Sequence, residues 1–494
     1  MKRTDLISRV VLLLVFSSLY FATASGITCS NDGSHYALTR ALAEEGRFTI
    51  ESYDEYAEGN DIARREGKLF SDRPPGTALL ASGFYKLGTW LPAPMVELPS
   101  RHDLGNSRLP YVMLVPVLAG SGTVVLLHLL LRELSVSVFS ALTTCVIFGL
   151  GTIHWKYSSV LFSHAPAALL VLLAVYLVIR ASRTPAPHPM LLLALGFIVG
   201  FAVLVEYSNA IVVAAIGLYL FLAVRPLPST HQLVPVALYV AGGLAPVSFL
   251  AFYNATNFGG PLALSYHYAV NYPWAGQLTE TFSFPLDRGL IAMLIWGEGG
   301  GWCNPTCYNQ GVFLLSPVLL LSLLGIRSYI RRARSESVLT LGLFLTYLGL
   351  FAKHRTFHGF TADGRYLAPF LALWCIPIAF YVDGTLGRGR DPSSTERPAP
   401  MEHPAWQAAG QLALYGAFFL SLRNIFLHIG FSYNYKLDLG RLSTPIAQPQ
   451  NWFYLLSRVF PNAGNLPLLW MCEGVVLALA LVAWRVRRQW VRMR

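Results

Sequence analysis

The chain has 494 residues, of which 54% are hydrophobic and only 13% are charged, and its mean hydropathy is +0.48. This composition is too apolar for a soluble globular protein and is typical of a chain that crosses a membrane many times. The formal net charge of +11 would suit nucleic acid if the basic residues formed one patch, but they are spread over short loops. We therefore expect a membrane protein with no nucleic-acid partner.

Hydrophobic runs of about 20 residues, long enough to cross the hydrocarbon core of a bilayer, recur along the chain. They predict an all-α polytopic protein with about twelve transmembrane helices. The first run resembles a signal peptide, but we expect it to stay as an uncleaved anchor. The runs lie near 9–27, 108–131, 137–153, 158–180, 190–205, 208–224, 233–253, 311–326, 338–353, 366–385, 408–428 and 466–486.

The basic residues of the short loops fall on one side of this pattern, which places both termini in the cytoplasm by the positive-inside rule. The alternation holds only if segment 76–91 does not cross, so we predict an amphipathic helix there, on the outer surface. The long loops then face outward. They are 28–107, 254–310, 354–365 and 429–465. We expect the plasma (inner) membrane and an outward-facing site.

Three regions follow from the pattern of runs and loops. Residues 1–385 hold the main transmembrane region, 386–407 form a Pro- and Ser-rich cytoplasmic linker, and 408–494 hold a C-terminal pair of spans with a basic tail. Cys303 and Cys307 share an outer loop, and whether they form a disulfide is left open.

The first outer loop carries an acid soon after the first span. Asp32 precedes apolar residues at helical spacing, and Gly46 is a plausible end of that helix. Asp32 is therefore either a helix N-cap or a fixed carboxylate at the membrane face that can act as a general base. His35 and Tyr36 follow on the same segment and are expected to line the same site.

A second polar unit on this loop combines Lys68 and Arg73 with the turn Pro74-Pro75-Gly76. The prolines hold the backbone extended and present the basic side chains just before the interfacial helix. Cations at that place suit a lipid phosphate, and ordinary headgroup contact by long basic side chains is the alternative.

Two ionisable residues lie near the outer ends of predicted spans: His164 and Glu206. Such groups are costly within a membrane unless they are paired or wetted, so both are functional candidates. We expect them to line the site, while a structural pair or a helix-to-helix hydrogen bond remains an alternative for each.

The outer loop at 353–370 brings His358, Asp363 and Arg365 to the same face. Arg365 stands at the start of a helix, where it can bind a phosphate or sugar hydroxyls with two parallel hydrogen bonds. The alternative is a solvated loop in which Arg365 and the tyrosine after it anchor the chain at the membrane interface. No set of ligands has the spacing of a metal site, so we predict none there, and a divalent cation as cofactor is left open.

Six segments taken together resemble the GT-C superfamily of integral-membrane glycosyltransferases, in particular the protein O-mannosyltransferase-like and aminoarabinose-transferase-like enzymes. In chain order they read SNDGSHY, FSDRPPG, WKYSSVLFSHAPAA, FYNATNFGGPLALSY, GVFLLSPVLLL and GRYLAPF. The resemblance extends from the N-terminus to about residue 385, and the ordered set is more specific than any one segment.

The resemblance implies an inverting glycosyltransferase that uses a polyprenyl-phosphate-linked sugar at the outer membrane face. It matches Asp32 to the family's catalytic acid and Arg73 to the basic residue before the Pro-containing turn, which is usually Lys. Lys68, Arg73 and Arg365 are then the expected ligands of the donor phosphate. The second acid that many relatives carry beside the first is absent, because Asn31 occupies that position.

The expected partners are the donor lipid, the membrane and a hydroxyl-bearing acceptor that is a protein, a glycan or a lipid. A polytopic secondary transporter or lipid flippase is the alternative function. Transporters show inverted repeats and polar positions near the bilayer midplane, whereas the polar residues here gather in outer loops. The sequence favours the enzyme without identifying its sugar or acceptor.

Overall fold

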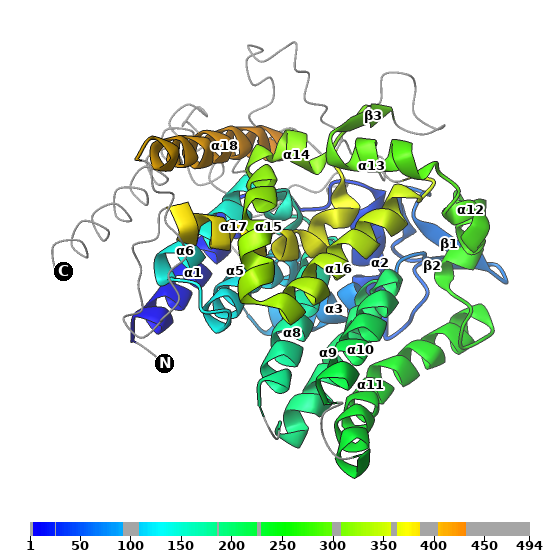
Figure 1. The fold of residues 1–494 in the computed structure, drawn as a ribbon. Helices are drawn as coiled ribbons and strands as arrows, with labels where there is room; N and C mark the ends of the chain where they lie inside the picture. The colour runs from blue at the N-terminus through cyan, green and yellow to red at the C-terminus, as the bar shows by residue number, and fades with distance from the viewer. Residues whose placement is uncertain are drawn as a thin grey trace.

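The computed structural model describes residues 3–24, 26–91, 108–184, 187–224, 229–298, 308–356, 363–385 and 404–430. Within these ranges most residues are helical, and two short antiparallel hairpins lie between the helices (Figure 1). The predicted all-α membrane fold is therefore confirmed.

Long apolar helices form the body of the molecule. Six helical stretches are long and apolar enough to cross a membrane, and three shorter apolar helices accompany them in the described part of the chain. The total of about twelve spans stays a prediction, because 466–486 lies outside the described residues. The long helices are α1 (Arg3–Ala22), α5 (Leu114–Glu133), α6 (Val138–Gly151), α8 (His164–Ser182), α9 (Pro189–Val205), α10 (Ala210–Val224), α11 (Ser229–Phe258), α15 (Leu321–Arg332), α16 (Arg334–Ala352), α17 (Leu371–Thr385) and α18 (Pro404–Gly430).

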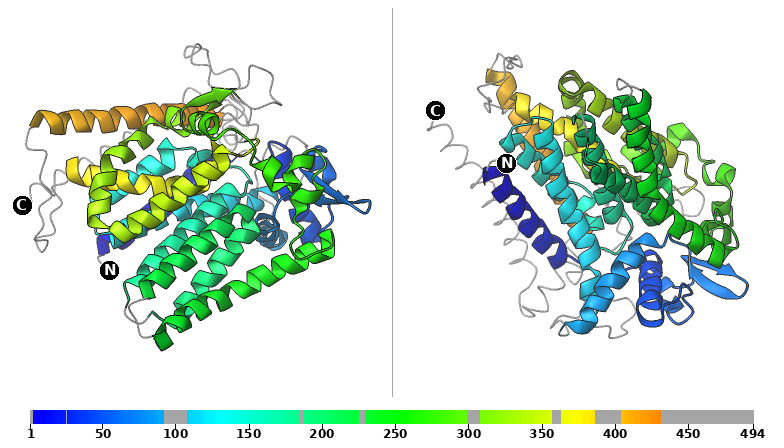
Figure 2. Two further views of the ribbon diagram at one scale, coloured as in Figure 1. Left: turned by 45° about the vertical axis from the view of Figure 1, so that its right-hand side comes forward. Right: turned by 90° about the horizontal axis from the view of Figure 1, so that it is seen from below.

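Helices that are separated by other elements in the sequence pack side by side through much of the bundle (Figure 2). Helix α5 contacts both α1 and α8, and α9 lies along α11. Glycines allow the last pair to approach closely: a Cβ atom on Gly196 would lie 1.9 Å from the carbonyl oxygen of Tyr239, and one on Gly242 would lie 2.0 Å from that of Leu193. Small residues at such contacts are typical of helix packing in membranes.

The first outer loop is a folded layer and not a tether. Helix α2 (Ser30–Arg40) continues into a π-helical turn, η1 (Ala41–Glu45), and ends at Gly46 in the left-handed conformation, as the sequence predicted. The expected helix at 76–91 is also present, as α3 (Gly76–Trp90). Its orientation along the membrane surface stays a prediction. Aromatic packing joins the layer, with the rings of Tyr36 and Tyr56 in edge-to-face contact at 4.9 Å.

Between these helices lie η2 (Asp54–Ala57) and a hairpin of β1 (Ile62–Arg65) and β2 (Lys68–Ser71). The sequence pattern predicts only a basic loop here, so the hairpin is a difference from that prediction. Backbone contacts occupy both outer sides of the hairpin: β1 meets a later loop through an Ala63–Ala269 bridge, and β2 meets Thr49 through Phe70.

The remaining elements are short and connect the long helices. They are α4 (Leu109–Val112), α7 (His154–Tyr157), η3 (Tyr207–Asn209), η4 (Ser265–Tyr268), η5 (Pro273–Gly276), α12 (Leu278–Thr281), α13 (Leu286–Leu294), β3 (Trp296–Glu298), β4 (Tyr308–Gln310), α14 (Val312–Leu315), η6 (Pro317–Leu320) and η7 (Arg365–Phe370). Of these, η3, η4 and η7 contribute residues to the site described below, and α7 contributes to a neighbouring cluster. The predicted linker 386–407 and most of the C-terminal pair lie largely outside the described residues.

Candidate active site

Asp32 is fully buried in the first turn of α2, and its carboxylate accepts hydrogen bonds on both oxygens. Oδ2 accepts from the backbone N–H of Thr28 (2.8 Å) and from its hydroxyl (2.9 Å), and Oδ1 accepts from the N–H groups of Cys29 (2.9 Å) and Gly33 (3.0 Å). Asp32 thus caps the helix from its third position, while Cys29 is the N-cap residue.

Burial raises the pKa of Asp32 to about 6, although the hydrogen bonds from Thr28 and Cys29 oppose the shift. A carboxylate with that pKa is ionised at neutral pH yet more basic than an ordinary aspartate. The capping bonds also fix its orientation. Both properties suit a general base, so capping and catalysis are compatible roles for this residue.

Arg73 lies between two carboxylates, Asp61 and Asp72, which no sequence pattern indicated. Its guanidinium forms an ion pair with Asp61, and its Nε lies 3.2 Å from Oδ1 of Asp72. All three side chains are largely removed from solvent, with 16%, 6% and 2% of Arg73, Asp61 and Asp72 exposed. Arginine is therefore held at the predicted position, but with two acidic partners.

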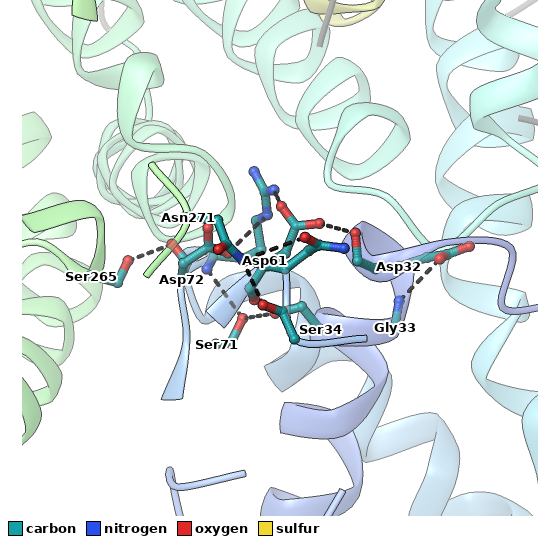
Figure 3. Close-up of polar contacts among 12 residues, drawn as sticks. Asp32, Gly33, Ser34, Asp61, Ser71, Asp72, Ser265 and Asn271 are labelled. Carbon is teal, nitrogen blue, oxygen red and sulfur yellow. Dashed lines mark hydrogen bonds and ion pairs between the residues drawn. The ribbon is translucent and has the colours of Figure 1, made fainter. Parts of the chain in front are cut away.

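Serine hydroxyls connect this cluster to α2 and to η4. Ser30 donates to the Asp61 carboxylate, so Asp61 joins the first turn of α2 to Arg73. Ser34 donates to the backbone oxygen of Asp61 at 2.6 Å, and Ser265 donates to that of Asp72, also at 2.6 Å. Figure 3 shows Asp61 between Asp32 on one side and Asp72 with Ser265 on the other.

His35 and His164 lie beside the same arginine. The His35 ring is buried, and neither of its nitrogens has a hydrogen-bond partner among the described residues. Burial and the charge of Arg73 lower the pKa of His35 to about 3, so this imidazole is neutral. His164 begins α8 and meets Tyr366 edge-on, with ring centroids 6.3 Å apart. The two histidines and Arg73 are close enough to interact electrostatically.

Glu206 follows α9 and faces both arginines of the site. Its Oε2 accepts a hydrogen bond from Ser163 at 2.8 Å, so its partner is the residue before His164 and not that histidine. Arg73 and Arg365 are the nearest positive charges that act on it. Glu206 therefore lines the space between the first loop and η7.

Arg365 begins η7 and is 5% exposed, with its guanidinium 5.2 Å from the ring centroid of Tyr366 and 5.5 Å from that of Phe162. Asp363, two residues earlier, is bound elsewhere. Its carboxylate lies 2.9 Å from Lys156 Nζ and 2.7 Å from His428 Nε2. Arg365 thus joins the site, whereas Asp363 anchors a neighbouring cluster.

Two other predicted site residues, Lys68 and Tyr36, are not brought to this cluster. Lys68 is exposed at the turn of the β1–β2 hairpin, and Tyr36 packs into the aromatic contacts of the outer layer. His358 lies outside the described residues, as do Cys303 and Cys307. No three His, Cys, Asp or Glu side chains in the described ranges are arranged to hold a metal ion, and we route no step through one.

A comparison with protein families and a comparison with solved structures both found similar proteins. A family model described as dolichyl-phosphate-mannose-protein mannosyltransferase matches residues 95–243. The search of curated proteins returned no match.

Among solved structures, the archaeal oligosaccharyltransferase AglB from Archaeoglobus fulgidus, in complex with an inhibitory peptide and a dolichol-phosphate, is similar with a TM-score of 0.52 at 12% identity. The match covers 87% of this chain and 56% of that one, so the present chain spans just over half of the archaeal protein. ArnT from Cupriavidus metallidurans, bound to undecaprenyl phosphate, is similar with a TM-score of 0.51 at 13% identity, over 87% of this chain and 71% of that one.

The matched family and both solved structures are GT-C membrane glycosyltransferases. The resemblance predicted from the six sequence segments is therefore confirmed at the level of the fold. A likeness at 12–13% identity identifies a fold and leaves the activity to be argued from the site.

Proposed function

We propose that this protein is a membrane glycosyltransferase that moves a sugar from a polyprenyl-phosphate-linked donor to a hydroxyl-bearing acceptor at the outer membrane face. The observation that carries the proposal is a GT-C fold in which the largely buried Arg73 and the buried Arg365 both act electrostatically on Glu206. The buried acid Asp32 lies in the helix turn that Ser30 and Asp61 connect to Arg73. Polyprenyl-phosphate lipids occupy both solved relatives with this fold, which supports a donor of this class.

In this mechanism Asp32 accepts the proton of the acceptor hydroxyl as the oxygen attacks the anomeric carbon. Attack comes from the side opposite the lipid phosphate, so the configuration inverts. The bond between sugar and phosphate breaks, and its electron pair leaves with the phosphate, whose negative charge rises. Arg73 and Arg365 stabilise that charge. Electrostatic stabilisation of the charge that develops in the transition state is usually the largest contribution to lowering such barriers. Lys68, at the exposed hairpin turn, is proposed to meet the donor from the solvent side.

The proposal also includes the orientation of the chain in the membrane. Both termini are placed in the cytoplasm by the positive-inside bias of the sequence, and the site then faces away from the cytoplasm at the plasma (inner) membrane. Hexose and pentose donors, and protein, glycan and lipid acceptors, are all compatible with the arrangement. A polytopic transporter or flippase remains the competing function for the test below.

Sugar transfer by the purified protein in lipid tests the proposal. A panel of polyprenyl-phosphate hexoses and pentoses is supplied with crude membrane acceptor, and Asp32→Asn is compared with Glu55→Gln, a matched control at an exposed acid of the same loop. We expect transfer by the wild type and by the control, and loss in Asp32→Asn.

Because Asp32 also caps α2, thermal unfolding of each variant must accompany the assay. A folded Asp32→Asn protein with full transfer would refute the general base. Absence of transfer from every donor, together with donor movement across the bilayer that Asp32→Asn does not alter, would favour the transporter.

A further inference from the structure

The cluster around Arg73 carries an unbalanced charge. Two carboxylates, Asp61 and Asp72, share one guanidinium in a place nearly closed to solvent. With both acids ionised the three groups sum to one negative charge. An uncompensated charge in such surroundings costs several kcal/mol, and groups in this position reduce the cost by taking up a proton.

The two acids differ in how well they are satisfied. Asp61 accepts a hydrogen bond from Ser30 and an ion pair from Arg73. Oδ1 of Asp72 accepts no hydrogen bond among the described residues and meets only the Nε of Arg73, at 3.2 Å. Burial and the charge of Asp61 raise the pKa of Asp72 to about 7, although Arg73 opposes the shift. Asp72 is therefore the member that exchanges a proton near neutral pH.

The groups that face the cluster from other elements supply no further positive charge to Asp72. His35 on α2 is neutral, and Glu206 after α9 is a third acid. The other facing groups are tyrosine hydroxyls. Burial raises the pKa values of Tyr207, Tyr266 and Tyr272 and keeps them neutral. Arg365 acts on Glu206, and the charges that act on Asp72 are those of Arg73 and Asp61.

We propose that the Asp61–Arg73–Asp72 cluster takes up one proton from solvent when a lipid-linked phosphodiester binds, and that Asp72 receives it. The inference rests on the proposed function, because it requires a phosphate at Arg73. A phosphodiester brings one negative charge to a cluster that already carries one. Protonation of Asp72 brings the net charge of the cluster to zero, so Arg73 can bind the phosphate. Asp61 and Asp72 are positioning residues, since they act through Arg73.

Binding of the methyl phosphodiester of undecaprenol to the full-length protein in nanodiscs tests this coupling. This probe has one fixed negative charge, so any dependence on pH belongs to the protein. For a group with a pKa of about 7, affinity should fall about 30-fold from pH 6 to pH 8.5, because binding is linked to one proton. Calorimetry in buffers of different ionisation enthalpy should show about one proton taken up per probe near pH 8.

Two variants separate this role from a merely structural one. In Asp72→Asn the titrating group is gone, and in Asp61→Asn the remaining pair is already neutral without a proton. Affinity should therefore vary less than about threefold over the same pH range in either variant, whereas Glu55→Gln should retain the wild-type dependence. The second variant keeps the test valid if the first fails to fold.

The outcomes distinguish the two hypotheses. Binding that is equally tight at all pH values in the wild type, or that keeps its pH dependence in both variants, would overturn the coupling and leave the glycosyltransferase intact. No binding of the probe by the wild type at any pH would refute the phosphate site of the proposed function, and the coupling with it.

Discussion

Two buried clusters of acids and bases lie near each other in this molecule, and they are built differently. In the first, Asp363 is a single carboxylate surrounded by donors: Lys156 Nζ, the Tyr157 hydroxyl and His428 Nε2 all lie within 2.9 Å of it. In the second, two carboxylates share Arg73, and an oxygen of Asp72 is left without a hydrogen bond.

The difference indicates that the Asp363 cluster stabilises the fold, whereas the Arg73 cluster is arranged for binding. The Asp363 cluster joins α7, the segment before η7 and α18, which are far apart in sequence, and every oxygen of its acid has a donor. A satisfied network of this kind fixes one arrangement. The Arg73 cluster is only partly satisfied, which costs stability and leaves the arginine available to another anion.

Lys156→Met should give the largest effect on folding. It leaves the Asp363 carboxylate buried without its cation, which costs about 3–5 kcal/mol, so the apparent melting temperature in detergent should drop steeply. Asp72→Asn removes surplus charge and keeps the shape of the side chain, so its melting temperature should equal or exceed that of the wild type. Equal decreases in the melting temperatures of the two variants would contradict the distinction between the clusters.

Arg73→Ala should give the largest effect on activity. It also leaves Asp61 and Asp72 without their cation, so activity is compared only for protein that is shown to be folded at the assay temperature. Removal of a preorganised charge from the leaving phosphate lowers kcat/KM by about 10²–10³-fold. Arg73→Lys should recover part of the loss, since it restores the charge without the planar fork. Arg64→Ala, at an exposed arginine of the same hairpin, is the control and should transfer sugar normally. A fully active Arg73→Ala protein would exclude this arginine from the phosphate site.

The pH dependence of kcat should report Asp32. A base works only when it is deprotonated, so the rate should rise with pH through the pKa of about 6 and level off above it. The requirement of Asp72 for a proton acts in the opposite direction, on donor affinity, near pH 7. Measurement at a saturating concentration of donor removes the effect of donor affinity and leaves the titration of Asp32. A rate that stays flat from pH 5 to pH 8 under those conditions would be inconsistent with Asp32 as the base.

Ser30→Ala should give the smallest effect of this series. It removes the hydroxyl that donates to Asp61 and costs about 0.5–1.5 kcal/mol, so transfer should fall about two- to tenfold. Ser82→Ala is the control, because that hydroxyl bonds only the backbone of its own helix α3. A loss as large as that of Arg73→Ala would mean that Ser30 contacts the substrate itself.

The parts of the fold that depend on local pattern were predictable. Apolar runs located the long helices, Gly46 marked the end of the helix after Asp32, and the segment after Pro75 formed the expected helix. Arg73 and Arg365 were found because a basic residue beside a proline turn or at a helix start is visible in a single segment.

The partners of these residues were not predictable, since they depend on contacts between distant segments. Asp61 reaches Arg73 only because the hairpin pairs Ile62 with Ser71. Its strands are four residues long and mix basic with apolar side chains, so they carry no clear alternation. Lys156 and Asp363 are 207 residues apart, and neither lies in a pattern that predicts the other.

Backbone contacts cover part of both outer edges of the β1–β2 hairpin. On the β1 side Val270 donates its N–H to the Ile62 carbonyl at 3.0 Å, and on the β2 side Ile50 donates to the Leu69 carbonyl at 2.9 Å. Proteins that capture extended peptides by adding a strand to a sheet need an open edge, and covered edges prevent such pairing. At the positions that these bonds occupy, the β1–β2 hairpin cannot pair with a further extended segment.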